Sequence, residues 1–368
     1  AKTYGGTGGE EAFSIAQTQD GGYVLAGLTW SFGLGYGDLI VLKLKSDGSL
    51  SWAKTYEGTS YDYVESIVPT QDGGYIVSGA TESFGAGFTD FLVLKLKSDG
   101  NLSWAKTFGG TEDDGDASII QTQDGGYLVV GMTMSFGAGL TDILVLKLSS
   151  DGSLSWAKTF GGKSRDEPYS ITQAQDGGYV IAGLTMSSGA GNADYLLLKL
   201  SSDGSLSWAK TFGGTGNDGA ESITQTQDGG YVVAGRTQSF GAGNDDLLIL
   251  KINSSGSLSW ARTYGGKSYD YANSIIQTQD GGYAVAGISE SFGAGMADFL
   301  ILKIDQNGNY SGCVQTCSPT AKNASPSTSS PSLTGVKCSP TVNSQTLTEA
   351  SANLTVKDVC SPSTKSGR

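Results

Sequence analysis

The sequence contains no histidine among its 368 residues. Histidine is the commonest general base and a frequent ligand of zinc and haem iron, so many enzyme mechanisms lack their usual group here. The cysteines do not replace it, because they lack the CxxC or CxxCH spacing of zinc and covalent haem sites. We therefore expect no enzymatic activity, no catalytic residues, no cofactor and no bound metal.

Positive charge is also scarce. The chain has 23 Lys and Arg against 36 Asp and Glu, which gives a formal net charge of −13. Because nucleic acid attracts basic surfaces, this balance argues against nucleic acid as a partner. Charged residues make up only 16% of the chain, too few for an extensive network of stabilising ion pairs.

Long apolar segments are absent as well: no run approaches the roughly 18 residues that a membrane-spanning helix needs. The chain begins at Ala1 rather than at methionine. We interpret this start as that of a secreted protein whose signal peptide has been removed, and we expect an extracellular or cell-surface location.

Cysteine is missing from most of the chain, and its four copies lie in the last 56 residues. An even number of cysteines in a loop-rich segment predicts disulfides, which persist in oxidising compartments. All pairings remain open, and the alternative is free thiols. The candidates are Cys313, Cys317, Cys338 and Cys360.

What the chain has in quantity is repetition. A block of 52 residues occurs six times without insertion or deletion, and a fixed period of this length is typical of a repeat architecture. The copies begin at Ala1, Ala53, Ala105, Ala157, Ala209 and Ala261.

Each block predicts four strands, as the second one illustrates. Residues 65–70 and 75–81 read as strands joined by a tight turn at Asp72-Gly73, because glycine there supplies the positive φ of a hairpin. A glycine-rich loop at 83–89 leads to an apolar strand at 91–97. The turn at 98–100 leads to a fourth strand at 101–108.

Hairpins of this kind predict an antiparallel sheet and exclude a parallel solenoid, whose strands need crossovers. Four-stranded sheets repeated in series are typical of a β-propeller. We therefore predict an all-β, six-bladed β-propeller over residues 1–312, followed by a disulfide-containing C-terminal tail over 313–368.

The repeat boundary predicts how the propeller closes. The fourth-strand motif SLSWAKT[YF] is split, with its second half at Ala1–Tyr4 and the remains of its first half at Gly308–Ser311. We expect the N-terminal segment to complete the last blade, because closure removes exposed sheet edges.

The repeats share one order of motifs, which is AKTYGG, SI, DGGY[IV]VAG, SFGAG, D and then LKL and SDG.LSW. This order resembles the SBBP-type β-propeller repeats of prokaryotic secreted and surface proteins. The resemblance covers residues 1–312. It implies a propeller outside the cytoplasm, and it implies no activity.

Tryptophan recurs at the end of five of the six repeats, at Trp52, Trp104, Trp156, Trp208 and Trp260. These rings could stack on sugars, but residues present in every repeat favour packing between blades with the indole N–H bonded to backbone. Trp30 differs, because other repeats carry Glu or Met, for example, at its position. It is our candidate ligand contact.

Acidic residues recur at two positions of the repeat, which we call the two acidic phases. Their carboxylates could bind calcium, or they could fix loops by accepting hydrogen bonds. We favour loop fixing. The densest acidic cluster is residues 112–116. The two phases are Glu10, Asp62, Asp114, Asp166, Asp218 and Asp270, and Asp38, Asp90, Asp142, Asp194, Asp246 and Asp298.

The tail is rich in Ser, Thr and Pro. Residues 346–348 and 352–356 nevertheless predict short strands able to extend a sheet edge. Sequons mark the candidate glycosylation sites Asn101, Asn253, Asn309, Asn323 and Asn353.

These observations predict a secreted structural or surface protein. Its propeller would be a rigid building block, and its tail would mediate self-association or attachment to another surface protein, a filament, a coat or the cell envelope. The alternative is a glycan-binding, adhesive propeller that uses Trp30.

Overall fold

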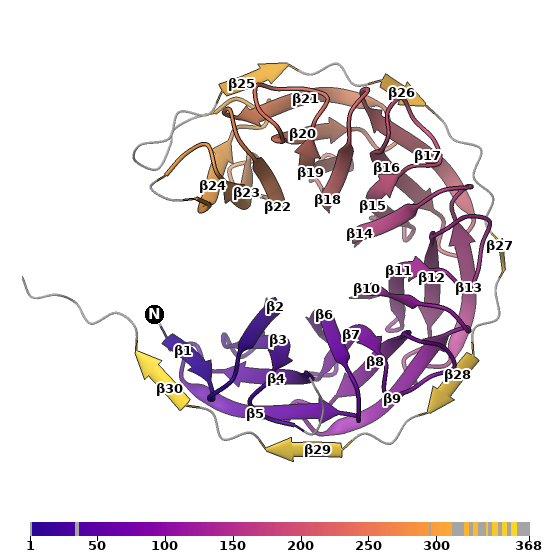
Figure 1. Cartoon of the computed structure of the whole chain (residues 1–368), viewed down its shortest axis with the longest axis vertical. Coiled ribbons are helices and arrows are strands. Elements are labelled where there is room, and N and C mark those ends of the chain that lie inside the picture. Colours follow the sequence, from indigo (N-terminus) through magenta and orange to yellow (C-terminus); the bar gives the residue numbers. More distant parts are fainter. Residues whose placement is uncertain are drawn as a thin grey trace, which may run out of the picture. The chain divides into compact units, whose positions relative to one another are not determined.

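The computed structural model describes residues 2–33, 37–293 and 296–310, together with six short strands between 320 and 358. Only strands and turns occur among these residues (Figure 1). No helix that could cross a membrane is present in this part of the chain. The four cysteines and Asn353 lie outside the described residues.

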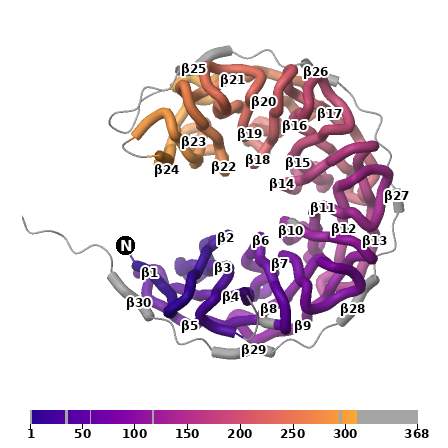
Figure 2. The backbone as a smooth tube through the Cα atoms, viewed as in Figure 1, coloured from indigo at the N-terminus to yellow at the C-terminus, as the bar shows by residue number. Residues whose placement is uncertain are grey.

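Each repeat forms one antiparallel sheet, and the first five blades have the predicted four strands and turns. In the second blade the strands are β6 (Asp62–Pro69), β7 (Tyr75–Thr81), β8 (Asp90–Leu96) and β9 (Leu102–Gly109). They pair in chain order, so β6 and β9 lie at opposite edges (Figure 2). Gly73 has the positive φ of 81° that the tight turn requires.

The described residues form six blade sheets, of which the sixth has three strands, and they confirm the all-β, six-bladed propeller. The first blade holds β2 (Glu10–Gln17), β3 (Tyr23–Thr29), β4 (Asp38–Leu44) and β5 (Leu50–Glu57). The third holds β10 (Asp114–Gln121), β11 (Tyr127–Thr133), β12 (Asp142–Leu148) and β13 (Leu154–Phe160), and the fourth holds β14 (Asp166–Gln173), β15 (Tyr179–Thr185), β16 (Asp194–Leu200) and β17 (Leu206–Gly213). The fifth holds β18 (Asp218–Gln225), β19 (Tyr231–Thr237), β20 (Asp246–Ile252) and β21 (Leu258–Gly265), and the sixth β22 (Asp270–Gln277), β23 (Tyr283–Ser289) and β24 (Asp298–Ile304).

Contacts divide the chain into two compact units, residues 1–129 with 147–155 and 339–368, and residues 130–146 with 156–338. In the first unit, blades one and two share an apolar core. The first blade contributes Val24, Ala26, Leu39, Val41 and Tyr56, and the second contributes several strand residues that include Leu92 and Leu94. In the second unit, equivalent positions form the cores between blades four and five and between blades five and six.

Third strands such as β8 are buried at every position, because both faces of the sheet are covered. Such strands are continuously apolar except where Lys interrupts them, as the sequence predicted.

The tail adds one further strand to the free edge of each of the first five blades. Figure 1 shows β28 (Thr341–Ser344) and β29 (Thr348–Ser351) along β9 and β5. In the same way β25 (Thr320–Asn323), β26 (Ser327–Ser329) and β27 (Val336–Lys337) pair with β21, β17 and β13. The predicted ability of the tail to extend sheet edges is therefore confirmed, although its strands begin a few residues later than expected.

The N-terminal strand pairs with a tail strand. β1 (Lys2–Gly5) forms a two-stranded sheet with β30 (Thr355–Asp358), while β22, β23 and β24 form a separate three-stranded sheet. Beyond β24, the described residues provide only an isolated bridge from Ile304 to Tyr310. β1 belongs to the first unit and β24 to the second, so the expected pairing of β1 with the last blade stays a prediction.

Candidate functional site

The recurring tryptophans are packing residues. The Nε1–H of Trp52 donates to the carbonyl of Ser98 over 3.3 Å, and its ring lies 6.0 Å from that of Tyr75 in the next blade. Trp208 and Trp260 donate in the same way to Ser254 and Gln306. All these rings are half-buried. They therefore fix each blade to the turn of the next, as the packing interpretation expects.

Trp30 lies in a different setting. Its side chain is 42% exposed, and its Nε1–H donates to the hydroxyl of Tyr61 over 3.4 Å. Tyr61 stacks on Tyr63 with ring centroids 5.4 Å apart and an interplanar angle of 20°. We call Trp30, Tyr61 and Tyr63 the aromatic cluster. Partly exposed rings with polar tips suit contact with a ligand that offers both apolar faces and hydroxyl groups.

The first acidic phase fixes loops. Asp62 accepts hydrogen bonds from the hydroxyl of Thr81, from the N–H of Gly58 at 2.8 Å and from the hydroxyl of Ser83 at 3.0 Å. Burial raises the pKa of Asp62 despite these hydrogen bonds, which favour the charged form. Asp218 has the equivalent partners in the fifth blade.

The second acidic phase fixes the SFGAG loops. One carboxylate oxygen of Asp90 accepts the N–H groups of Ala86 and Gly87 at 2.7 and 3.2 Å. Its other oxygen is buried without a hydrogen-bond partner. Burial raises the pKa of Asp90, and the neighbouring charge of Asp114 raises it further. One carboxylate of each phase therefore lies beside the same glycine: Asp90 of the second blade and Asp114 of the third both lie next to Gly109.

These pairs do not amount to a metal site in the described part of the chain, where no group of three or more His, Cys, Asp or Glu side chains is placed to hold an ion. Within the acidic cluster 112–116, Asp114 instead accepts the N–H of Gly110 at 2.7 Å.

A lysine clamp recurs between the DGG turn and the third strand. The buried Lys95 ammonium donates to the hydroxyl of Thr70 and to Asp72, both at 2.9 Å, and to the carbonyl of Leu96 at 3.2 Å. Burial disfavours the charged form of Asp72, but hydrogen bonds from Thr70 and Lys95 outweigh it and lower its pKa to about 2. Equivalent pairs are Lys43–Asp20, Lys147–Asp124, Lys199–Asp176 and Lys251–Asp228.

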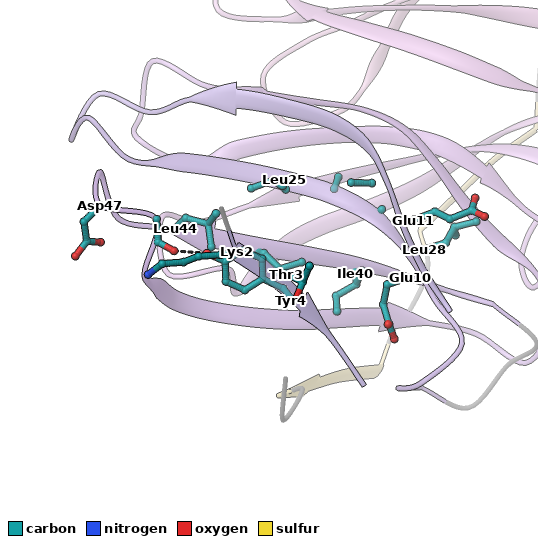
Figure 3. Close-up of a pocket in the computed structure, with 15 residues that line it drawn as sticks. Lys2, Thr3, Tyr4, Glu10, Glu11, Leu25, Leu28, Ile40, Leu44 and Asp47 are labelled. Carbon is teal, nitrogen blue, oxygen red and sulfur yellow. Dashed lines mark hydrogen bonds between the residues drawn. The ribbon is translucent and has the colours of Figure 1, made fainter. Parts of the chain in front are cut away.

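The first blade carries a cavity of about 590 Å³, shown in Figure 3. Its apolar wall includes Leu25, Ile40, Leu42 and Leu44. Tyr4 lines it as well and donates its hydroxyl to the carbonyl of Gly48. Charged residues, namely Lys2, Glu10, Glu11 and Asp47, also contribute to its lining.

The cavity occupies a position that is filled elsewhere. The counterparts of its wall in the second blade are Val77, Leu92, Leu94 and Leu96, all at most 1% exposed. They are buried because the preceding blade packs on them. The cavity is therefore the face of the first blade on which a preceding blade would pack, and we call it the first-blade face.

Three of the candidate glycosylation sites lie in turns and one lies in a strand of the described part of the chain. Asn101, Asn253 and Asn309 are exposed, and Asn101 and Asn309 donate their side-chain amides to nearby aspartates. Asn323 lies in β25. Their modification stays a prediction, as do the disulfides.

Sequence reasoning missed the first-blade face and the partners of Trp30. Tyr61 and Tyr63 belong to the repeat after the one that contains Trp30. The sequence signal was a difference between these repeats: the first has Gly9 and Glu11 where the second has the two tyrosines.

No family model matches the sequence. The regulatory protein FlaEY of Caulobacter vibrioides is 24% identical over 232 residues, which cover 56% of this chain and 23% of that protein. The chain thus spans less than a quarter of that relative's length.

Several solved structures are similar to the chain. One is a protein of unknown function from Bacteroides caccae, with 14% identity, 69% of this chain and 81% of that chain covered, and a TM-score of 0.39. Another is a puromycin hydrolase variant, with 14% identity, coverages of 84% and 46%, and a TM-score of 0.48. We transfer no activity from either protein to this chain.

Proposed function

We propose that this protein is a secreted structural or surface protein without enzymatic activity. Its propeller acts as a rigid building block, and its C-terminal extension mediates assembly or attachment to a filament, a coat or the cell envelope. The resemblance to repeats of secreted and surface proteins supports the location.

One observation carries this proposal: the tail binds blade edges as added strands. Strand addition uses backbone hydrogen bonds, which the edge of any neighbouring antiparallel sheet offers equally well. A tail that extends five edges of its own chain can therefore also extend an edge of a neighbour.

The repetition of the blades supports a role without catalysis. The aspartates, lysines and tryptophans described above recur from blade to blade and bond locally to loops and turns. Catalysis usually requires one blade to differ, whereas a building block does not.

The test compares the full chain with a chain that ends at Tyr310. We expect the shorter chain to fold, because strands of neighbouring blades build the described core clusters. Electron microscopy should show extended assemblies of the full chain and at most short oligomers of the shorter one. Extended assemblies that persist without the tail would contradict the proposed role of the tail.

A second candidate function is glycan binding, which the aromatic cluster favours. We expect saturable binding of a sugar or polysaccharide in a glycan screen, and its loss in Trp30→Ala. The matched control is Met134→Ala, because Met134 occupies the equivalent exposed position in the third blade. Equal binding by both variants would contradict this candidate.

A further inference from the structure

The part of the tail that forms strands is itself a repeat. From Thr320 onward it consists of six segments of seven residues, each of which begins with Thr or Ser. We call these segments the tail modules, and their number equals that of the propeller repeats. Their first residues are Thr320, Ser327, Thr334, Thr341, Thr348 and Thr355.

The modules pair with the blades in one register. In the fourth module, Thr341 pairs with Gly109, Val342 with Phe108 and Asn343 with Thr107. The first residues of the other modules for which this position is described pair with the equivalents of Gly109. These equivalents are Gly265 for the first module, Gly213 for the second, Glu57 for the fifth and Gly5 for the sixth.

The third module agrees with this register. Its third and fourth residues, Val336 and Lys337, pair with Thr159 and Lys158. These partners stand 52 residues after those of the third and fourth residues of the next module, which are Thr107 and Lys106. A step of seven residues along the tail therefore corresponds to a step of 52 residues back along the propeller.

The blade edges that the modules meet are almost the same. We call the edges of β1, β5, β9, β13, β17 and β21 the tail-binding edges. Each carries the motif AKT[YF]G, in which only Glu57 of the first blade and Arg262 of the fifth depart from the pattern. Each module therefore meets nearly the same residues.

The modules differ at most of their paired positions. Their second to fourth residues are AKN, TSS, GVK, VNS, EAS and VKD, which share no side-chain type. Antiparallel pairing instead uses backbone N–H and C=O groups, which any extended segment offers. Recognition in one register with different side chains is thus recognition of the backbone.

The placement of proline in the modules supports recognition of the backbone. Proline cannot donate a hydrogen bond to a neighbouring strand. The first four positions of every module lack it, although the modules contain three prolines at their fifth or seventh positions. These are Pro326, Pro331 and Pro340.

We propose that the tail-binding edges are equivalent binding sites, each of which accepts any tail module. The ligand of each site is an extended peptide segment with four proline-free residues in the register described above. This inference deepens the proposed function and rests on it, because a module that fits every edge of its own chain also fits the same edges of a second copy.

The first test deletes residues 341–347, which removes the fourth module and keeps the seven-residue step between the others. If the modules are interchangeable, the fifth module moves to β9 and the sixth to β5, so only β1 loses its tail strand. Hydrogen exchange by mass spectrometry should become faster in the N-terminal peptide that contains β1. It should stay as in wild type in peptides spanning 102–109 and 50–57.

A shorter deletion is the control for this test. Removing only residues 345–347 keeps every paired position but joins Ser344 directly to Thr348. Because consecutive Cα atoms lie only about 3.8 Å apart, these two residues cannot pair with different blades as they do in wild type. At least one of the peptides 102–109 and 50–57 should then exchange faster. Faster exchange of peptide 102–109 in the seven-residue deletion would overturn the proposal, because β9 would then accept only its own module.

The second test keeps the length of the chain and exchanges the order of the fourth and fifth modules, residues 341–347 and 348–354. Peptides 102–109 and 50–57 should keep their protection from exchange. Loss of protection in either would show that modules and edges are matched individually, which contradicts the proposal. Failure of the proposed function has a different signature, since it appears as extended assemblies that persist without the tail.

Discussion

At the scale of single residues, the molecule uses one set of polar contacts repeatedly. The lysine clamp ties a hairpin turn to the third strand, and the two aspartate phases hold the loops at the opposite end of each blade. These contacts stabilise the fold, and the contribution of each to the free energy of unfolding can be measured by a substitution in a single blade.

The first residue-scale prediction concerns the lysine clamp. Lys95→Met keeps the apolar stem but removes three hydrogen bonds, so we expect a loss of about 1–2 kcal/mol in the free energy of unfolding. The loss is moderate because Asp72 remains largely exposed. Urea denaturation measures it.

The pH dependence of this difference follows from Asp72. Its folded pKa of about 2 lies below the ordinary 3.8, so its stabilising effect is complete above 3.8 and is lost as the pH falls toward 2. The difference between wild type and Lys95→Met should shrink over that interval. The control Lys97→Met, at an exposed neighbour, should stay within about 0.5 kcal/mol of wild type. An equal effect of both substitutions would contradict the clamp.

The second residue-scale prediction concerns Asp90, whose pKa is raised by burial. A raised folded pKa means that the folded state keeps a proton which the unfolded state has released, so stability falls as the pH rises above about 4. Asp90→Asn should remove this fall, by at most about 1.4 kcal/mol per pH unit. Unfolding free energies at pH 4 and pH 7 check this. A variant with the same slope as wild type would refute it.

At the scale of elements, short-range patterns predicted the strands well and the long-range pairing poorly. The Asp72-Gly73 turn and the alternation of its flanking strands are local, and the structure places both hairpins of the second blade where the sequence predicted them. The pairing of β1 with β30 was not predictable, because an added edge strand binds through backbone hydrogen bonds, which carry no side-chain code.

The spacing of the tail strands was a signal that sequence reasoning overlooked. Hydroxyl residues recur every seven positions, and five of the six tail strands begin at such a residue. These starts are Thr320, Ser327, Thr341, Thr348 and Thr355. One tail segment per blade edge explains this period.

The element-scale prediction tests this pairing at one blade. Val342→Pro with Asn343→Pro in β28 removes two adjacent N–H groups, at least one of which faces β9. Backbone amides of β9 should then exchange hydrogen faster, by mass spectrometry of a peptide spanning 102–109. The peptide spanning 206–213 is the control, because β17 pairs with β26. Unchanged exchange in β9 would show that β28 does not protect it.

At the scale of the whole molecule, the sequence predicted the number of blades, because the 52-residue repeat occurs six times without insertion or deletion. The aromatic cluster and the first-blade face were not, because each depends on which residues of different strands come together in space. Repeats that are nearly identical in sequence differ in exposure only through their place in the series.

The most direct measurement is sedimentation of the full chain in the analytical ultracentrifuge over a range of concentrations. The account predicts oligomers that grow with concentration, and at most short oligomers of a chain that ends at Tyr310. A wild-type chain that sediments as a single copy throughout the range would contradict the account of the protein as a building block.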